Sequence, residues 1–181
     1  MKKLYIEGKN NPELRAAFFN LLSKELTDVM PRVVLGNGIS QTVNKFRTTP
    51  IEKGEKRFLL VDSDEKISDR DDLVKRVNAK CSQKNCRIEV TPDNTFFMEQ
   101  EVEAWILSQP DTLKKRKVTV GLPLENITSI CKPSEKLAEI YQKNGKQYNK
   151  TKEFSAVFKN IDSEKLKEFS SEYKSLIDKL K

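Results

Sequence analysis

The sequence predicts an α/β fold in which a parallel sheet is flanked by helices. Short apolar runs alternate with amphipathic segments over the first 110 residues, and this rhythm is typical of parallel sheets. The run Phe58–Val61 is wholly apolar, as expected of a strand that helices cover on both faces. Beyond residue 110 the alternation ends, so we expect a helical C-terminal extension.

The first strand is expected at Lys3–Ile6, and a helix should follow it. Asn11 is expected to cap this helix, with Pro12 in its first position. The apolar residues of the helix recur three and four positions apart, as they do on one face of a helix. The other elements expected before residue 111 are strands in 31–36 and 57–62, helices in 39–47 and 70–81, a strand and turn in 86–94, and a segment from 95 that begins as a strand and becomes a helix.

Residues 111–181 differ from the rest in charge. They carry 16 Lys and Arg against 10 Asp and Glu, whereas residues 1–110 carry 18 against 17. Nearly all of the net charge of +7 therefore lies in the C-terminal part, which favours a surface that faces a polyanion, or else a solvated helical surface. Helices are expected in 133–143, 152–159 and 163–180. We expect an α/β core, 1–110, and a basic, mainly helical segment, 111–181, packed on it as one compact domain.

The composition excludes several kinds of chemistry. The chain has no histidine, which excludes Ser-His-Asp and Cys-His catalysis. Its three cysteines have no CxxC spacing, so they do not form a zinc ligand set, and their odd number fits a reducing cytoplasm. No apolar run approaches the roughly 20 residues that span a bilayer, and we expect no secretion signal. Carboxylates, lysines and hydroxyls remain, and carboxylates suit Mg²⁺ or Mn²⁺.

Acidic residues end two of the expected strands. Glu7 closes the first strand before Gly8, and Asp62 and Asp64 close the third. In open α/β sheets, ligands bind at the carboxyl ends of the strands. If the two strands are neighbours, about 4.8 Å apart, Glu7 meets both aspartates, and carboxylates this close repel one another unless a cation neutralises them. The pattern therefore predicts a divalent-cation site.

Helix capping is the alternative role for acids after a strand. We assign capping to the acidic residues that precede the segment LVKRV at 73–77, where negative charge stabilises a helix N-terminus. These residues are Asp69, Asp71 and Asp72. Asp62 and Asp64 lie too far upstream to cap that helix.

A Glu-Gly that closes the first strand and an Asp-x-Asp that closes a later one resemble the Toprim domain of topoisomerases, bacterial primases and overcoming-lysogenization-defect nucleases. Three further segments resemble the small RloG-like family of Toprim-related proteins. They are FFMEQEVEAWILSQP at 96–110, KPSEKL at 132–137 and YNKT at 148–151. The resemblance covers most of the chain and implies a Toprim-like, that is Rossmann-like, sheet.

The resemblance also implies metal-dependent hydrolysis of phosphodiester bonds in DNA or RNA by an endonuclease that uses Mg²⁺ or Mn²⁺. The carboxylates that match its metal ligands are Glu7, Asp62, Asp64 and, for a second metal, Glu103. Glu101 matches a further acid before Trp105, and Lys132 and Lys150 match basic positions that would contact the scissile phosphate. Glu103 and Trp105 have a structural alternative, because a tryptophan on an amphipathic helix is commonly a core residue.

RloG-like proteins lie beside ATPases in bacterial defence loci, so the resemblance implies an ABC-type or AAA-type ATPase partner and an effector role in anti-phage defence in the cytoplasm. The chain itself has no GxxxxGK[ST] phosphate loop. The expected partners are this ATPase and a nucleic acid, with no membrane, and self-association stays open. One alternative is a catalytically silent regulatory or binding subunit. Another is a receiver-like phosphoacceptor, which normally needs an acidic pair after the first strand, where this chain has only Glu7.

Overall fold

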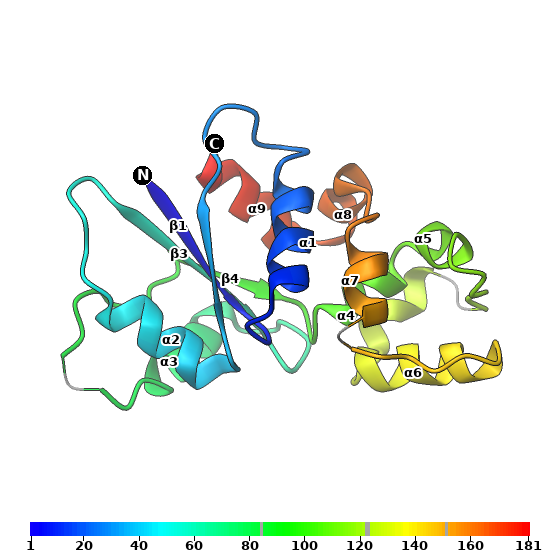
Figure 1. Cartoon of the computed structure of the whole chain (residues 1–181). Helices are drawn as coiled ribbons and strands as arrows, with labels where there is room; N and C mark the ends of the chain where they lie inside the picture. The colour runs from blue at the N-terminus through cyan, green and yellow to red at the C-terminus, as the bar shows by residue number, and fades with distance from the viewer. Residues whose placement is uncertain (84, 122–123, 151) are drawn as a thin grey trace.

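The computed structural model describes residues 1–83, 85–121, 124–150 and 152–181. Its sheet is parallel, with the strand order β2-β1-β3-β4. The strands are β1 (Lys2–Glu7), β2 (Arg32–Gly36), β3 (Lys56–Asp62) and β4 (Thr95–Met98). Leu4 of β1 lies opposite Phe58 of β3, which confirms that the first and third strands are neighbours. The predicted α/β class, with helices on both sides of a parallel sheet, is confirmed (Figure 1).

Alternate residues of the strands pack on opposite faces of the sheet, as the pleat requires. On one face, Tyr5, Leu59 and Val61 pack against helices α2 (Ile39–Thr48) and α3 (Arg70–Ala79). On the other, Leu4, Ile6 and Leu60 share a cluster with helix α1 (Pro12–Leu22) and with the C-terminal helices. Figure 1 shows α2 and α3 on one side of the sheet and α1 and α9 on the other. The strands are thus buried on both faces.

The C-terminal helices extend the core beyond the sheet. They are α4 (Glu103–Leu107), α5 (Pro110–Lys114), a 3₁₀ helix (Leu124–Ser129), α6 (Pro133–Lys143), α7 (Lys152–Phe158), α8 (Ser163–Phe169) and α9 (Ser171–Leu180). Trp105 of α4 has no exposed surface, and its ring stacks on Phe158 and meets the ring of Tyr173 edge-on. Trp105 is therefore a core residue that joins three of these helices. No helix in the described ranges has the length and apolar character needed to cross a membrane.

Two predicted caps are confirmed by their hydrogen bonds. The side chain of Asn11 accepts from the Leu14 backbone N–H at 2.6 Å, with Pro12 as the first residue of α1. The side chain of Asp69 accepts from the Asp72 N–H at 3.0 Å at the start of α3. These caps satisfy donors that have no partner within the helix.

Two predicted elements are wrong. Residues 86–94 form no strand, because the Arg87 N–H bonds to the Arg47 carbonyl at 2.7 Å rather than to a sheet neighbour. The helix expected at 163–180 is divided at Ser170, whose backbone is extended and whose hydroxyl accepts from the Tyr173 N–H at 3.1 Å. A serine side chain that bonds to the backbone in this way competes with helix continuation and starts a new helix.

Candidate active site

Glu7 and Asp62 meet at the carboxyl end of the sheet because β1 and β3 are adjacent and both end there. The Asp62 backbone N–H donates to Glu7 Oε2 at 3.2 Å. Gly8 then turns the chain into α1, and a Cβ at this position would lie only 2.8 Å from Leu14 Cδ2. The predicted convergence of Glu7 and Asp62 is therefore present in the fold.

Both carboxyl groups lie where ionisation is disfavoured. Burial raises the pKa of Glu7 to about 7, and the nearby charge of Asp64 adds to this effect. Burial also raises the pKa of Asp62 well above its usual range, with further contributions from Glu7 and Glu103. Lys150 and backbone N–H donors act in the opposite direction but do not cancel the rise. The site is thus short of positive charge, which is the condition that favours a bound cation.

Glu103 brings a third carboxylate to the cluster from the first turn of α4. Its side chain is fully buried, with Oε1 3.0 Å from Lys150 Nζ and 3.4 Å from the Tyr148 hydroxyl. Among the described residues, Oε2 of Glu103 has no hydrogen-bond partner. Buried carboxylate oxygens are seldom left without one, so this atom indicates a missing donor or ligand.

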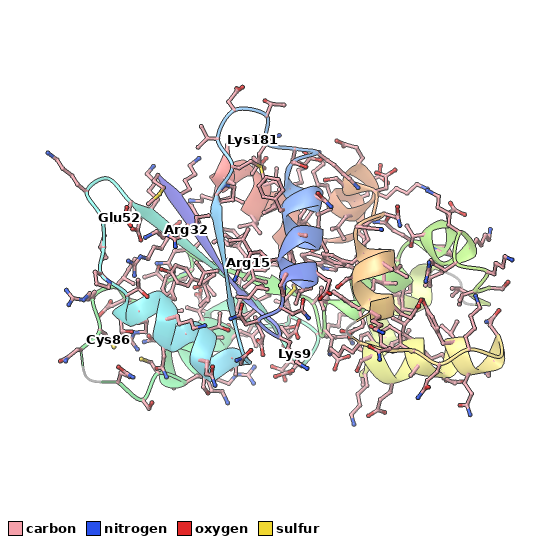
Figure 2. The ribbon with its side chains drawn as sticks, viewed as in Figure 1. Lys9, Arg15, Arg32, Glu52, Cys86 and Lys181 are labelled. Atoms are coloured by element: carbon pink, nitrogen blue, oxygen red, sulfur yellow. The ribbon has the colours of Figure 1, made fainter. Side chains whose placement is uncertain are left out.

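A cavity of about 360 Å³ lies beside these groups. Glu7, Asp62 and two lysines, Lys9 and Lys150, line it together with apolar side chains such as Phe154. Figure 2 shows Lys9 by the carboxyl end of β1. The cavity therefore combines acidic groups that can hold a cation with lysines that can hold an anion.

Asp64 does not follow the strand alternation that its Asp-x-Asp spacing suggested. Its backbone has a φ of 57°, and its N–H bonds to the Gln100 carbonyl at 2.9 Å, so the chain has already left the extended conformation. The side chain is exposed and lies beside a neighbouring hollow, although its charge still reaches Glu7. The expectation that Asp62 and Asp64 project together as in a strand is wrong, and Asp64 lies at the rim of the cluster.

Glu101 and Lys132 lie together, away from the cavity wall. Glu101 Oε2 accepts from the Ser134 backbone N–H at 2.7 Å, where α6 begins. Lys132 is exposed, and its ammonium pairs with Glu135 at 2.8 Å. Of the two predicted lysines, Lys150 lines the cavity, whereas Lys132 lies beside the helix start that Glu101 caps.

The donor chemistry of the cluster fits a hard divalent cation, since Glu7, Asp62 and Glu103 supply oxygens only. The unpartnered Oε2 of Glu103 also fits a missing ligand. Within the described ranges, however, no three Asp, Glu or Cys side chains are positioned to hold one metal ion. Glu103 is instead paired with Lys150.

Two residues of the site were not predicted. Tyr148 contacts Glu103, and it belongs to the YNKT segment, whose lysine alone had been given a role. Lys9 lines the cavity two residues after Glu7, and its nearness to a strand end was the available signal. Thr151 of the same YNKT segment lies outside the described residues.

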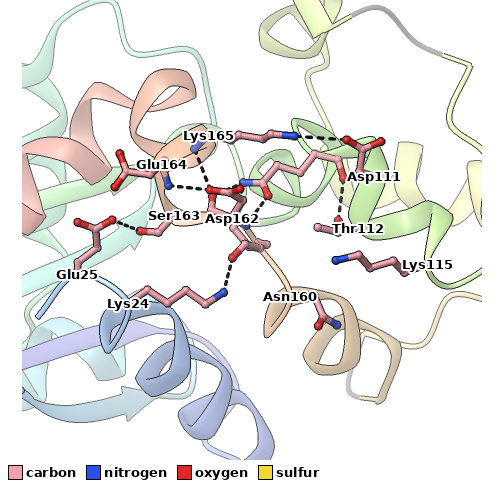
Figure 3. Close-up of a pocket in the computed structure, with 12 residues that line it drawn as sticks. Lys24, Glu25, Asp111, Thr112, Lys115, Asn160, Asp162, Ser163, Glu164 and Lys165 are labelled. Carbon is pink, nitrogen blue, oxygen red and sulfur yellow. Dashed lines mark hydrogen bonds and ion pairs between the residues drawn. The ribbon is translucent and has the colours of Figure 1, made fainter. Parts of the chain in front are cut away.

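A second cavity, of about 420 Å³, lies between the end of α1 and helices α5 and α8 (Figure 3). Its polar groups bond to one another. Gln109 exchanges two hydrogen bonds with the Asp162 backbone, at 2.6 and 2.9 Å, and Lys24 donates to the Ile161 carbonyl at 2.6 Å. None of the unpartnered buried side-chain atoms in the described part of the chain lines this cavity. It is therefore the weaker candidate for a site.

The fold and the cluster define an α/β protein with a cavity at the carboxyl end of a parallel sheet, lined by both carboxylates and lysines. The chain belongs to the family described as Domain of unknown function (DUF4276), whose model matches residues 15–181. The match includes Asp62, Glu103 and Lys150 but begins after Glu7. Searches of curated proteins and of solved structures found no significant match. This family match does not bear on the Toprim and RloG-like resemblance, which stays a prediction.

Proposed function

We propose that the chain is a divalent-cation-dependent nuclease that hydrolyses phosphodiester bonds of DNA or RNA at the cavity beside Glu7 and Asp62. The observation that carries the proposal is the cluster itself. Glu7, Asp62 and Glu103 converge there, the pKa values of the first two are raised, and Oε2 of the third has no partner among the described residues.

Glu7 and Asp62 are the residues that would hold Mg²⁺ or Mn²⁺, with Asp64 at the rim, and Glu103 would join them only if it separated from Lys150. A bound cation of this kind lowers the pKa of water and neutralises charge on a reacting phosphate. Lys9 and Lys150 line the same cavity and would bind the phosphate oxygens.

Nucleic acid is the substrate class that the charge distribution favours. The net charge of +6 on residues 111–181 would attract a phosphate backbone without selecting a sequence. The ATPase partner and the role in anti-phage defence are part of the same proposal, and they rest on the RloG-like resemblance alone.

The direct test incubates the purified protein with plasmid DNA, single-stranded DNA and tRNA, in Mn²⁺ or in EDTA. We expect cleavage in Mn²⁺ only. Asp62→Asn should lower the rate at least about 100-fold, because it removes a charge from the cation site and leaves the shape unchanged. The matched control is Asp71→Asn, the same change at an exposed residue of α3, which should cleave as the wild type does. Cleavage that persists in EDTA or in Asp62→Asn would contradict the proposal.

A silent binding subunit is the second candidate function. The ion pair between Glu103 and Lys150 favours it, because that pair already neutralises part of the cluster without a metal. Under this alternative, none of the three substrates is cleaved and Mn²⁺ does not bind.

A further inference from the structure

Lys150 bridges the solvent and the buried part of the cluster. Its side chain is 64% exposed, whereas that of its partner Glu103 is fully buried. The ammonium is 3.0 Å from Glu103 Oε1. Burial disfavours the charged lysine, but the charges of Glu103, Asp62 and Glu101 outweigh this and raise its pKa. Lys150 is thus a cation that belongs to the chain and neutralises the cluster.

Separation of this ion pair would cost little free energy at Lys150 and much more at Glu103. Because most of the Lys150 side chain is exposed, its ammonium can leave Glu103 with little loss of packing. Glu103 cannot follow, and a buried carboxylate without a counter-charge is strongly destabilising. The neutral Tyr148 hydroxyl, 3.4 Å away, is its other described contact. Lys150 can therefore leave at low cost only when another cation takes its place.

We propose that Lys150 acts as an exchangeable counter-cation, which a divalent cation displaces from Glu103 and which then binds an anionic oxygen of the substrate in the adjacent cavity. This inference rests on the proposed function, because it concerns the same cation site. The released ammonium remains at the cavity that it already lines with Lys9. Cation binding and anion binding then support each other, and such coupling is reciprocal. The exchange also explains why the carboxylates of the cluster lie near one another although, in the described part of the chain, no three of them are positioned to bind one metal ion. Lys150 occupies the place of the cation.

The test is calorimetric titration of the metal-free protein with Mn²⁺. Lys150→Met removes the competing charge, so we expect it to bind Mn²⁺ about tenfold more tightly than the wild type. The matched control is Lys9→Met. Lys9 lines the same cavity, is exposed, and forms no side-chain hydrogen bond or ion pair with any residue that the structure describes. Its removal should tighten Mn²⁺ binding by less than about twofold, because exposed charges are screened.

A second measurement covers the case in which Lys150→Met unfolds. Without metal, this variant should melt at a lower temperature than the wild type, and Mn²⁺ should restore most of the difference. Lys150→Arg keeps the charge and should bind Mn²⁺ no more tightly than the wild type. Its melting temperature without metal should match that of the wild type.

The outcomes separate this inference from the proposed function. If the folded wild type and all variants bind Mn²⁺ equally, or if Lys9→Met tightens binding as much as Lys150→Met, the exchange is wrong and the cation site stands. If neither the wild type nor any folded variant binds Mn²⁺, the cation site of the proposed function fails, and the exchange fails with it.

Discussion

At the amino end of the sheet a buried carboxylate lies between two cations, whereas at the carboxyl end the half-buried Glu7 and Asp62 lie side by side, and the charge of Glu7 raises the pKa of Asp62. Glu55 contacts Lys3 Nζ at 2.8 Å through one oxygen and pairs with Arg57 through the other. Although burial opposes ionisation, the hydrogen bonds from Lys3 and Arg57 lower the pKa of Glu55 to about 2. At the opposite end of the same two strands, β1 and β3, burial raises the pKa of Glu7 to about 7.

Burial opposes ionisation at both ends, and the two ends differ in whether nearby positive charge offsets it. Arg57 also donates to the Phe46 and Pro50 carbonyls, at 2.8 and 2.6 Å, so the charges at the amino end have partners. Figure 2 shows Glu52, which also pairs with Lys3, near the amino end and Lys9 near the carboxyl end. Compensated buried charges hold a fold in one arrangement, whereas uncompensated ones mark candidate functional sites. The comparison therefore supports a structural role for Glu55 and a functional one for the acidic cluster.

Glu55→Gln should have the largest effect on stability. It leaves the buried cations Lys3 and Arg57 without their shared carboxylate, so we expect a loss of about 3–5 kcal/mol in the free energy of unfolding. Urea unfolding at pH 7 measures it. Adding Mn²⁺ should not restore the loss, because this end of the sheet has no role in cation binding.

The control for this prediction is Glu52→Gln, since Glu52 contacts the same Lys3 ammonium at 2.8 Å. Its side chain is 58% exposed, so the change should cost less than about 1 kcal/mol. Equal losses in the two variants would mean that burial does not distinguish the two partners of Lys3.

Glu55 and Glu7 should make the stability of the fold depend on pH in opposite directions. The size of this effect should lie between those of Glu55→Gln and Asp62→Asn. The folded-state pKa of Glu55 lies below its ordinary value of 4.5, so stability should be lost as pH falls from about 4.5 to 2. The folded-state pKa of Glu7 lies above that value, so the native state binds more protons and stability should fall as pH rises from about 4.5 to 7. We expect this second fall to be about 1–3 kcal/mol in EDTA.

Urea unfolding at pH 5, 6, 7 and 8 checks the second slope, and the absence of histidine removes the usual groups that titrate there. Glu7→Gln should flatten the profile. A wild-type stability that rises between pH 5 and 7 in EDTA would show that the carboxyl end is better compensated than its geometry indicates.

The sequence predicted that Glu7 and Asp62 lie near each other at the carboxyl end of the sheet. The apolar run before Asp62 and the short strand before Glu7 were sufficient for this prediction, because the carboxyl ends of adjacent parallel strands meet at one edge. The caps at Asn11 and Asp69 were likewise local, since each bonds to a residue three positions later.

The features that the sequence did not predict depend on contacts between distant segments. Nothing near Asp64 indicates that its N–H bonds to Gln100 and turns its side chain to the rim. The ion pair of Lys150 with Glu103 joins a loop to a helix from another part of the chain. The strand expected at 86–94 failed for the same reason, because the partner of Arg87 is Arg47 of α2. The periodicity of apolar residues describes one segment at a time. The positions of Asp64, Lys150 and Arg87 depend instead on contacts between two segments that are far apart in the sequence.

Apart from the Glu52→Gln control, Asp62→Asn should have the smallest effect on stability, and its sign should be opposite to that of Glu55→Gln. Asp62 Oδ1 accepts from the Val102 N–H at 3.0 Å, and the asparagine oxygen can keep this bond. Its amide group can donate to Glu7 or Glu103, whose charges raise the pKa of Asp62. Removing one of the mutually repelling charges should therefore raise the free energy of unfolding in EDTA by about 1 kcal/mol at pH 8. In Mn²⁺ the sign should reverse, because the wild type gains stability from the cation it binds and the variant gains less. Loss of stability in EDTA would instead identify Asp62 as a structural residue, like Glu55 at the opposite end of the sheet.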